Sequence, residues 1–363
     1  MKRLLFSLLL PFTVIACHRL GTAPVIGPFS GQELQQFVAL NPIDAHAHVF
    51  ISDPAFYAML NKLNLHILDI LVIDDTNPSR SSLSKESQET WEFVKGSEGH
   101  VSVCTTFNPY EFNRPGFDHL AIRQIDQEFD KGAIGVKIWK NIGMELKDAS
   151  GNYILPDNAI FEPIYKDIAA HNKTLIAHLA DPSGLWQPPN PKSPEYSYYQ
   201  ENPQWYMYAK SHPPSKEQIL QARDHVLEQN ENLRMVGAHL GSLEGNFDLL
   251  GQEFDRYPNF AVDLAGRVPF LMLQPRADMI VFITKYQDRL IYGTDIELGF
   301  GENRPSVDWE GTYAKHWRFL ATNDVLNYRG GTIRGLALPP SILRKLYHNN
   351  AVRWFPGILG NSQ

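Results

Sequence analysis

Apolar runs rich in Val, Ile, Leu and Ala recur along the chain, and between them lie segments whose apolar residues repeat at helical spacing. Buried strands of a parallel sheet are apolar on both faces, so the runs predict strands and the amphipathic segments predict helices. The pattern predicts eight strands, at residues 43–50, 65–76, 101–107, 133–139, 174–180, 233–241, 259–265 and 289–295.

Predicted helices lie between successive strands, at residues 54–63, 86–94, 117–130, 161–171, 215–229, 247–257 and 278–285. Strands that alternate with helices in this way are typical of a (β/α)8 barrel, so the sequence predicts a single α/β TIM barrel over residues 38–358. A doubly wound open sheet is the alternative fold. No Gly-x-Gly-x-x-Gly turn follows any predicted strand, which disfavours a dinucleotide-binding sheet.

Two aromatic-rich insertions interrupt the alternation, after strands 5 and 8. Residues 182–214, rich in Pro, Tyr and Trp, follow the fifth strand, and residues 296–340, with Trp309, Tyr313 and Trp317, follow the eighth. Loops at the carboxyl ends of barrel strands build active sites, so the first insertion is a candidate lid or specificity loop, and the second is expected to close the other side of the pocket. An aromatic plug that covers helices is an equal alternative for the first insertion.

The N-terminal residues resemble an export signal. Lys2-Arg3 precedes an apolar run that is too short for an ordinary membrane span, and the run ends in Val14-Ile15-Ala16-Cys17, which is similar to a bacterial lipobox. We therefore expect residues 1–17 to be a signal peptide and the protein to be exported to the periplasm, with a lipid anchor on Cys17. A cleaved signal without lipid, or an uncleaved anchor, is the alternative. Residues 18–37, rich in Gly and Pro, are expected to form a flexible tether.

Composition limits the partners. Hydrophobic residues make up 43% of the chain, which is sufficient for a large core, and the net charge is -7. No basic run is present, so nucleic acid is not an expected partner. We expect a small-molecule substrate, a membrane contact only through the lipid, and leave open a homo-oligomer. Cys104 lies in a strand-like run and is expected to be a small buried residue.

Ionisable residues recur near the carboxyl ends of the apolar strands, and these ends converge on one face of a parallel barrel. His46 and His48 are two residues apart, so on a strand both project from the same face. Burying so many polar groups together is costly unless they share a partner, and a divalent cation such as Zn2+ suits imidazole and carboxylate ligands. The set comprises His46, His48, Lys137, His178, His239, Asp263 and Asp295.

These residues and their local motifs resemble the amidohydrolase superfamily, and more closely its amidohydrolase-related branch, which includes aminocarboxymuconate semialdehyde decarboxylase and metal-dependent lactonases. The resemblance implies that His46, His48, His178 and Asp295 bind a catalytic metal, with His239 beside it as an acid/base or oxyanion-stabilising group. It rests on Asp44-Ala45-His46-Ala47-His48, Ala177-His178, Gly237-Ala238-His239, Tyr292-Gly293-Thr294-Asp295 and the closing segment His348-Asn349-Asn350-Ala351-Val352-Arg353.

Lys137 leaves the number of metal ions open. In binuclear relatives a carboxylated lysine on the fourth strand bridges two ions, whereas the decarboxylase-like branch uses one. We expect one Zn2+ per chain, because three or so protein ligands and an open position are already available without the lysine. Two ions remain the alternative if Lys137 is carboxylated. Unmodified, Lys137 would pair with a ligand carboxylate or substrate. Lys140 is a candidate for the same role, with a solvated loop lysine as the alternative.

The expected activity is hydrolysis of a small ester, lactone or amide by a metal-activated water. Asp295 would serve as ligand and general base, His239 would stabilise charge on the carbonyl oxygen, and Arg267 is a candidate anchor for a substrate carboxylate. Asp263 is a further candidate for bridging or substrate binding. A non-oxidative decarboxylase on the same ligands is the second expectation, and a non-catalytic binding lipoprotein is the third.

Overall fold

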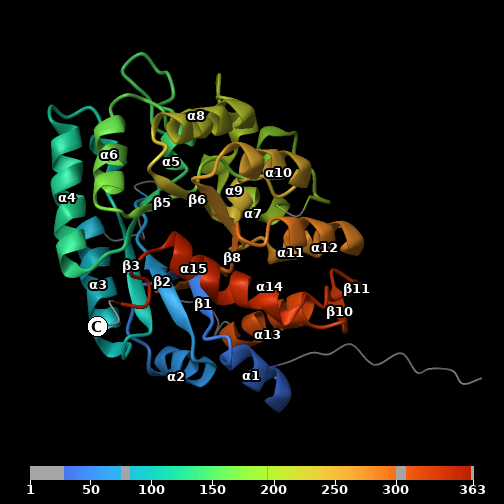
Figure 1. Cartoon of the computed structure of the whole chain (residues 1–363). Coiled ribbons are helices and arrows are strands. Elements are labelled where there is room, and N and C mark those ends of the chain that lie inside the picture. Colours follow the sequence, from blue (N-terminus) through green and yellow to red (C-terminus); the bar gives the residue numbers. More distant parts are fainter. Residues whose placement is uncertain (1–27, 75–81, 194, 300–307, 361–363) are drawn as a thin grey trace, which may run out of the picture.

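The computed structural model describes residues 28–74, 82–193, 195–299 and 308–360. Its centre is a curled sheet of parallel strands in the order β8-β7-β6-β5-β4-β3-β2-β1-β9 (Figure 1). These strands are β1 (Ile43–Val49), β2 (His66–Ile70), β3 (Val101–Thr106), β4 (Gly135–Ile138), β5 (Thr174–Ala177), β6 (Arg234–Gly237), β7 (Phe260–Asp263), β8 (Leu290–Ile291) and β9 (Ile296–Leu298).

The two ends of this sheet meet on one short stretch of chain. β8 pairs with β7, and β9 pairs with β1, although only Tyr292–Asp295 separate β8 from β9. Between them, Ala45 N donates to Tyr292 O at 3.0 Å and Asp295 N donates to His46 O at 2.9 Å. The last predicted strand, 289–295, is therefore shortened to β8, with β9 beginning just after it, and the sheet curls into a TIM-barrel-like arrangement of the predicted α/β class.

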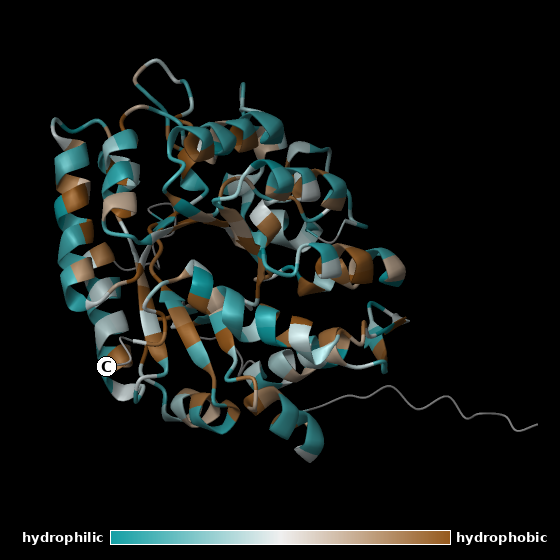
Figure 2. Ribbon diagram, viewed as in Figure 1, coloured by the Kyte–Doolittle hydropathy of each residue, from teal (hydrophilic) through white to brown (hydrophobic). Residues whose placement is uncertain are grey.

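Successive residues of the strands pack on opposite sides of the sheet. Leu175 and Met235 join the cluster that lies between the sheet and the helices, whereas their neighbours Ile176 and Val236 join a second cluster with Trp354. The central strands carry many hydrophobic residues (Figure 2), and the two clusters place such residues on both faces of the sheet. This is the pattern from which buried parallel strands were predicted.

Helices surround the sheet. A capping box begins α8, in which the Ser215 hydroxyl accepts from Gln218 N while the Gln218 side chain accepts from Ser215 N. The longer helices are α2 (Pro54–Leu63), α3 (Leu83–Gly96), α4 (Phe117–Lys131), α6 (Glu162–Ala170), α8 (Lys216–Gln229), α10 (Phe247–Arg256), α12 (Arg276–Lys285) and α13 (Trp309–Ala321). The shorter ones are α5 (Asn141–Met144), α7 (Tyr196–Glu201), α9 (Ala238–Gly241), α11 (Val268–Leu271), α14 (Pro340–Arg344) and α15 (Asn350–Trp354).

The expected tether is wrong for its last part, because residues Gly31–Val38 form the helix α1. Ser30 caps this helix in a capping box with Glu33, and Glu33 also pairs with Arg318 at 2.7 Å. Phe37 is fully buried, with its ring 5.7 Å from that of Trp317. The prediction relied on nearby Gly and Pro and overlooked Phe37, whose burial docks the helix. The expected signal peptide and the tether up to residue 27 lie outside the described residues.

Tyr313 and Trp317, in the described part of the segment after β9, do not line the predicted pocket. In α13, Tyr313 and Trp317 are buried against the core, and the Tyr313 hydroxyl donates to Asp44 at 2.7 Å. A hairpin of β10 (Val325–Tyr328) and β11 (Gly331–Arg334) follows. These aromatic residues therefore stabilise the fold, contrary to the expectation that they close the pocket.

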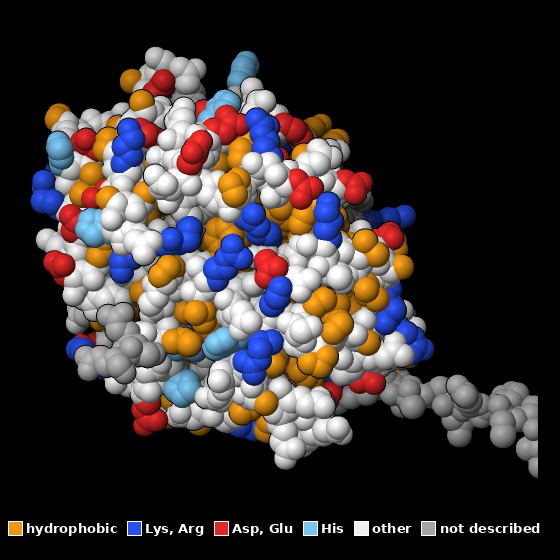
Figure 3. Space-filling view, in the orientation of Figure 1, with side chains coloured by type: hydrophobic (Ala, Val, Ile, Leu, Met, Phe, Trp, Pro, Cys, Tyr) orange, Lys and Arg blue, Asp and Glu red, His pale blue; other side chains and the backbone are white. Residues whose placement is uncertain are grey.

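On the face shown in Figure 3, Lys and Arg side chains are interspersed with acidic and apolar ones. In the described part of the chain, no helix combines the length and apolar character that crossing a membrane requires. Cys104 is a buried free cysteine in β3, as predicted.

Candidate metal centre

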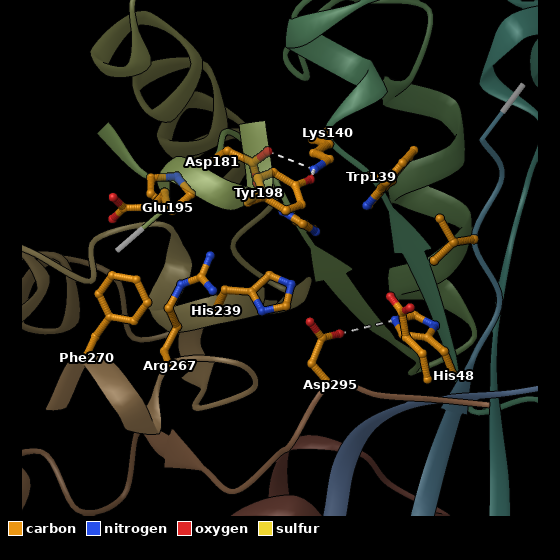
Figure 4. A pocket seen from close by; sticks show the side chains of 14 residues that line it. His48, Trp139, Lys140, Asp181, Glu195, Tyr198, His239, Arg267, Phe270 and Asp295 are labelled. Atoms are coloured by element: carbon orange, nitrogen blue, oxygen red, sulfur yellow. Dashed lines mark hydrogen bonds and ion pairs between the residues drawn. The ribbon is translucent and has the colours of Figure 1, made fainter. Parts of the chain in front are cut away.

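The predicted site residues gather where the strands end. β1 carries His46 and His48, β4 carries Lys137 and β7 ends in Asp263. The remaining three, His178, His239 and Asp295, follow β5, β6 and β8. Figure 4 shows His48, His239 and Asp295 around one pocket. The convergence of the strand ends thus brings residues from six strands together, as the barrel prediction required.

Three ligand atoms form a compact group. Asp295 Oδ1 lies 3.5 Å from His46 Nε2 and 3.6 Å from His48 Nε2, and all three atoms lie within 4.8 Å of one another. The other ring nitrogens are bonded to oxygens: His46 Nδ1 lies 2.8 Å from Asp263 Oδ2, and His48 Nδ1 lies 2.6 Å from Ile70 O. Carboxylate and carbonyl oxygens accept hydrogen bonds, so both Nδ1 atoms carry the proton and both Nε2 atoms present lone pairs.

Lone pairs on two buried imidazoles and a partly exposed carboxylate converge here, an arrangement that a cation between them stabilises. Two histidines and an aspartate are also ligands that Zn2+ and related divalent ions prefer. The His46, His48 and Asp295 side chains therefore fit a divalent metal ion, by the chemistry and the direction of their donor atoms.

Lys137 lies beside this group. Its side chain is buried, and its Nζ lies 3.1 Å from His46 Nε2. Burial lowers the pKa of Lys137 to about 8, against the attraction of Asp263 and Asp295. An unmodified Lys137 thus contacts a candidate metal ligand from the side of β4.

Asp263 orients two histidines and is not exposed to the pocket. Its Oδ2 accepts from His46 Nδ1, and its Oδ1 accepts from His239 N at 2.8 Å and from Ala265 N at 3.1 Å. Burial raises the pKa of Asp263 to about 6, and Lys137 opposes the rise. Its oxygens contact donors on His46, His239 and Ala265, so in this arrangement Asp263 orients His46, while Asp263, His46 and His239 also form a second group whose ligand atoms lie within 4.8 Å of one another.

His239 lies in a left-handed turn at α9. His239, Leu240, Gly241 and Ser242 have φ values of 58°, 60°, 60° and 62°, a conformation that is costly for residues other than glycine. His239 Nδ1 lies 2.8 Å from Ala265 O, so this ring also presents a lone pair on Nε2. Burial holds the pKa of His239 well below its ordinary value. A neutral ring of this tautomer has a lone pair and no N–H at Nε2, so it can donate a hydrogen bond to an oxyanion from Nε2 only after it is protonated.

His178 stands outside the compact group among the described residues. Its Nε2 lies 3.1 Å from Asp181 Oδ1, and its ring centroid lies 4.3 Å from that of His239. Burial lowers the pKa of His178 to about 3. Burial would raise the pKa of Asp181, but Lys140 and the hydrogen bond with His178 hold it below its ordinary value.

A cavity of about 270 Å³ opens in front of these groups. His48, His178, His239 and Asp295 form one part of its lining, and Lys140 and Arg267 add two cationic side chains. Asp181, Trp139 and Phe270 also line the cavity and were not predicted as site residues, whereas Glu195, Tyr198 and Glu297 belong to the two insertions that were expected to border the pocket. Asp181 follows His178 by three residues, and this spacing is the feature of the sequence that could have identified Asp181 as a site residue.

Lys140 is buried, so the alternative of a solvated loop lysine is wrong. Its Nζ lies 2.7 Å from Asp181 Oδ2 and donates to the Tyr198 hydroxyl, with the Trp205 ring centroid 4.8 Å away. Tyr198 belongs to α7 and Trp205 follows it, so the insertion after β5 contributes to the cavity wall, whereas Tyr199 of the same helix is buried away from it.

Arg267 follows β7 and contributes its side chain to the cavity (Figure 4). Its Nε lies 3.9 Å from Glu244 Oε2, too far for a hydrogen bond, and its Nη1 donates to Gly266 O at 3.3 Å. The Phe270 ring centroid lies 5.1 Å from the guanidinium carbon. A guanidinium placed in this way can bind the carboxylate of a ligand in the cavity by donating hydrogen bonds to its oxygens.

A curled parallel sheet with a His and Asp cluster at its carboxyl edge defines a class of metal-dependent barrel enzymes. The family model described as Amidohydrolase matches residues 107–357, which is more than half of the chain. The chain therefore belongs to the amidohydrolase family, in agreement with the resemblance inferred from the sequence motifs. No curated protein matches it.

Solved structures share the fold at low identity. An amidohydrolase II structure has 16% identity and a TM-score of 0.52, and the match covers 86% of this chain and 99% of that one. A dihydroxybenzoic acid decarboxylase from a Polaromonas species, with bound manganese and the inhibitor 2-nitroresorcinol, has 11% identity, coverage of 86% and 96%, and a TM-score of 0.51. A 2,6-dihydroxybenzoate decarboxylase from Rhizobium has 12% identity, coverage of 86% and 98%, and a TM-score of 0.50.

Proposed function

We propose that this protein is a metal-dependent hydrolase of a small ester, lactone or amide. The observation that carries the proposal is the convergence of His46 Nε2, His48 Nε2 and Asp295 Oδ1 beside a cavity of substrate size. His46, His48, His178 and Asp295 would hold one Zn2+ ion per chain, which leaves a position for water. Carboxylation of Lys137 would be needed for a second ion.

A bound zinc ion would supply a hydroxide nucleophile near neutral pH and polarise the scissile carbonyl. Asp295 has a second carboxylate oxygen besides the one near His46 and His48, and this oxygen would take the proton of the attacking water. Burial and the nearby Glu297 raise the pKa of Asp295 to about 7 in the metal-free chain. Asp295 would then pass the water's proton to the leaving group, with His239 beside it as the acid/base group.

Arg267 would anchor a carboxylate of the substrate. Its guanidinium lies at the cavity wall beside Phe270, and its fork of donors matches the two oxygens of a carboxylate. The substrate we propose is therefore a small carboxylate-bearing ester, lactone or amide. The neighbouring rings of Trp139, Tyr198 and Phe270 favour a flat one.

The test uses His46→Ala and Asp295→Ala. Each variant should lose bound zinc and the hydrolysis of a panel of carboxylate-bearing lactones, while its circular dichroism remains native, because strand ends at this face serve chemistry more than stability. His66→Ala removes a histidine of β2 that contacts Ser102 at 3.0 Å, and it should keep the metal. Wild-type activity in either site variant would refute the metal assignment.

A non-oxidative decarboxylase is the second candidate. Two cationic side chains and three aromatic rings line the cavity, and this lining also suits an aromatic carboxylic acid that loses carbon dioxide. Zinc-loaded protein incubated with such acids and, separately, with lactones would separate the two activities. Carbon dioxide release without lactone hydrolysis would favour the decarboxylase.

We further propose that the protein is exported and anchored through lipid on Cys17, because a basic start, a short apolar run and a lipobox-like end occur in that order. Mass spectrometry of the native N-terminus tests this. A mature chain that begins elsewhere, or an unmodified Cys17, would refute it.

A further inference from the structure

The four histidines of the candidate metal centre, His46, His48, His178 and His239, do not use the same ring nitrogen for their hydrogen bond to an oxygen. In His46, His48 and His239, Nδ1 contacts an oxygen acceptor, namely Asp263 Oδ2, Ile70 O and Ala265 O, respectively. In His178 the nitrogen that contacts an oxygen acceptor is Nε2, 3.1 Å from Asp181 Oδ1. A neutral imidazole carries one proton, so the acceptor fixes which nitrogen keeps a lone pair.

Asp181 is itself held by a second partner. Its other oxygen, Oδ2, lies 2.7 Å from Lys140 Nζ, and both side chains are almost completely buried. Lys140 also donates to the Tyr198 hydroxyl, and the ring centroids of Tyr198 and Trp205 each lie 4.8 Å from its Nζ. An ammonium offers only donors, so the oxygen of Asp181 nearest to Lys140 must be an acceptor. The carboxylate thus serves two donors, one on each oxygen.

We propose that Asp181 is a positioning residue that sets His178 in the tautomer opposite to that of His46, His48 and His239. His178 then keeps its lone pair on Nδ1, whereas the other rings keep theirs on Nε2, so a metal ion held by His178 would be bound through Nδ1. Lys140 orients the carboxylate, because it binds one oxygen of Asp181 and leaves the other for His178. The metal part of the inference rests on the proposed function, but the tautomer is a property of the chain alone.

The arrangement makes Asp181→Asn an informative substitution. An amide has one acceptor, its oxygen, and the Lys140 ammonium requires it. The amide NH2 would then face His178 Nε2, which would have to accept, and the proton would move to Nδ1. In the Lys140→Met, Asp181→Asn double variant the amide oxygen is released to face His178, so the original tautomer should return. Lys140→Met alone keeps the carboxylate and should leave the tautomer unchanged.

The first readout is the His178 tautomer in the metal-free full-length protein, from long-range proton–nitrogen correlation spectra. The His178 signal is identified by its loss in His178→Gln. We expect a protonated Nε2 in wild type, Lys140→Met and the double variant, and a protonated Nδ1 in Asp181→Asn. Asp157→Asn is the matched control, because Asp157 also bonds a histidine, His225, at 2.9 Å, but outside the site. It should leave His178 unchanged.

The second readout is zinc affinity, measured by competition with a chelator. Loss of a group that orients a metal-binding histidine lowers metal affinity by about 10- to 100-fold, which we expect for Asp181→Asn, with recovery in the double variant. If Asp181 had a purely structural role, zinc affinity would fall in Asp181→Asn and in the double variant alike. Circular dichroism of every variant controls for folding.

Two results would overturn the inference: a wild-type His178 with its proton on Nδ1, or an Asp181→Asn variant that keeps the proton on Nε2. Failure of the proposed function gives a different pattern. Wild-type protein that binds no zinc would refute the metal centre, while the tautomer pattern of the metal-free variants would still test the role of Asp181.

Discussion

His239 is the residue whose contacts most restrict its role. We predict that His239→Asn retains about one zinc per chain and loses about 100-fold or more in kcat, the loss typical of removing an acid/base group. His46, His48, His178 and Asp295 already supply four protein ligands, so His239 is not needed to bind the ion. Asparagine tolerates the left-handed backbone of this position, where φ is 58°, so the substitution adds little strain.

Metal analysis beside single-turnover kinetics checks this prediction. A wild-type count of two ions that falls towards one in His239→Asn would contradict it and would indicate a binuclear centre bridged by carboxylated Lys137. Asn246→Asp serves as a control for a polar substitution on the same loop, since the Asn246 side chain caps α10 and an aspartate can accept the same hydrogen bond from Leu249 N.

The sequence predicted which residues gather, because a polar residue at the end of a parallel strand must lie near its counterparts on the other strands. It did not predict how their side chains pair. Asp263 bonds His46 and His239, and Asp181 bonds His178 and Lys140, through rotamers that neighbouring strands and loops select. These contacts assign the tautomers, and they depend on the folded chain.

Helix α1 is the most N-terminal helix of the described residues, and a substitution in it tests whether this part of the chain contributes to the stability of the fold. We predict that Phe37→Ala lowers the free energy of unfolding by about 3–5 kcal/mol, the range for removing a buried phenylalanine side chain. The Phe37 ring lies 5.5 Å from that of Tyr347 and 5.7 Å from that of Trp317, so its loss leaves a cavity against two other elements. Denaturant unfolding of the variant measures the change. A flexible tether would give no change, and exposed Gln36→Ala is the matched control.

The order of strands and helices was predictable because each is amphipathic or apolar with its own period. The residues at which the strands and helices end were less predictable. The predicted strand 233–241 stops at Gly237, where His239 to Ser242 turn left-handed, and the predicted strand 289–295 is interrupted before Asp295, whose φ is 67°. Both departures occur at candidate site residues, where side-chain placement takes precedence over a regular strand.

The body of the protein should not need the metal ion to fold. Beneath the site, Ile176, Val236, Ala261 and Ile291 form an apolar layer inside the sheet, and Trp354 of α15 packs against it. None of these side chains is a metal ligand, so their burial is independent of the ion.

We therefore predict that removing the metal with a chelator abolishes turnover while the far-ultraviolet circular dichroism at 25 °C stays native, and that added zinc restores activity. Thermal unfolding should remain cooperative and shift only by the binding free energy of the ion, about 2.7 kcal/mol when free zinc exceeds its dissociation constant a hundredfold. Because ligand binding acts by mass action, the shift should grow with the logarithm of the zinc concentration. Loss of the native circular dichroism on chelation would show instead that the ion is structural, since proteins that fold around a metal unfold without it.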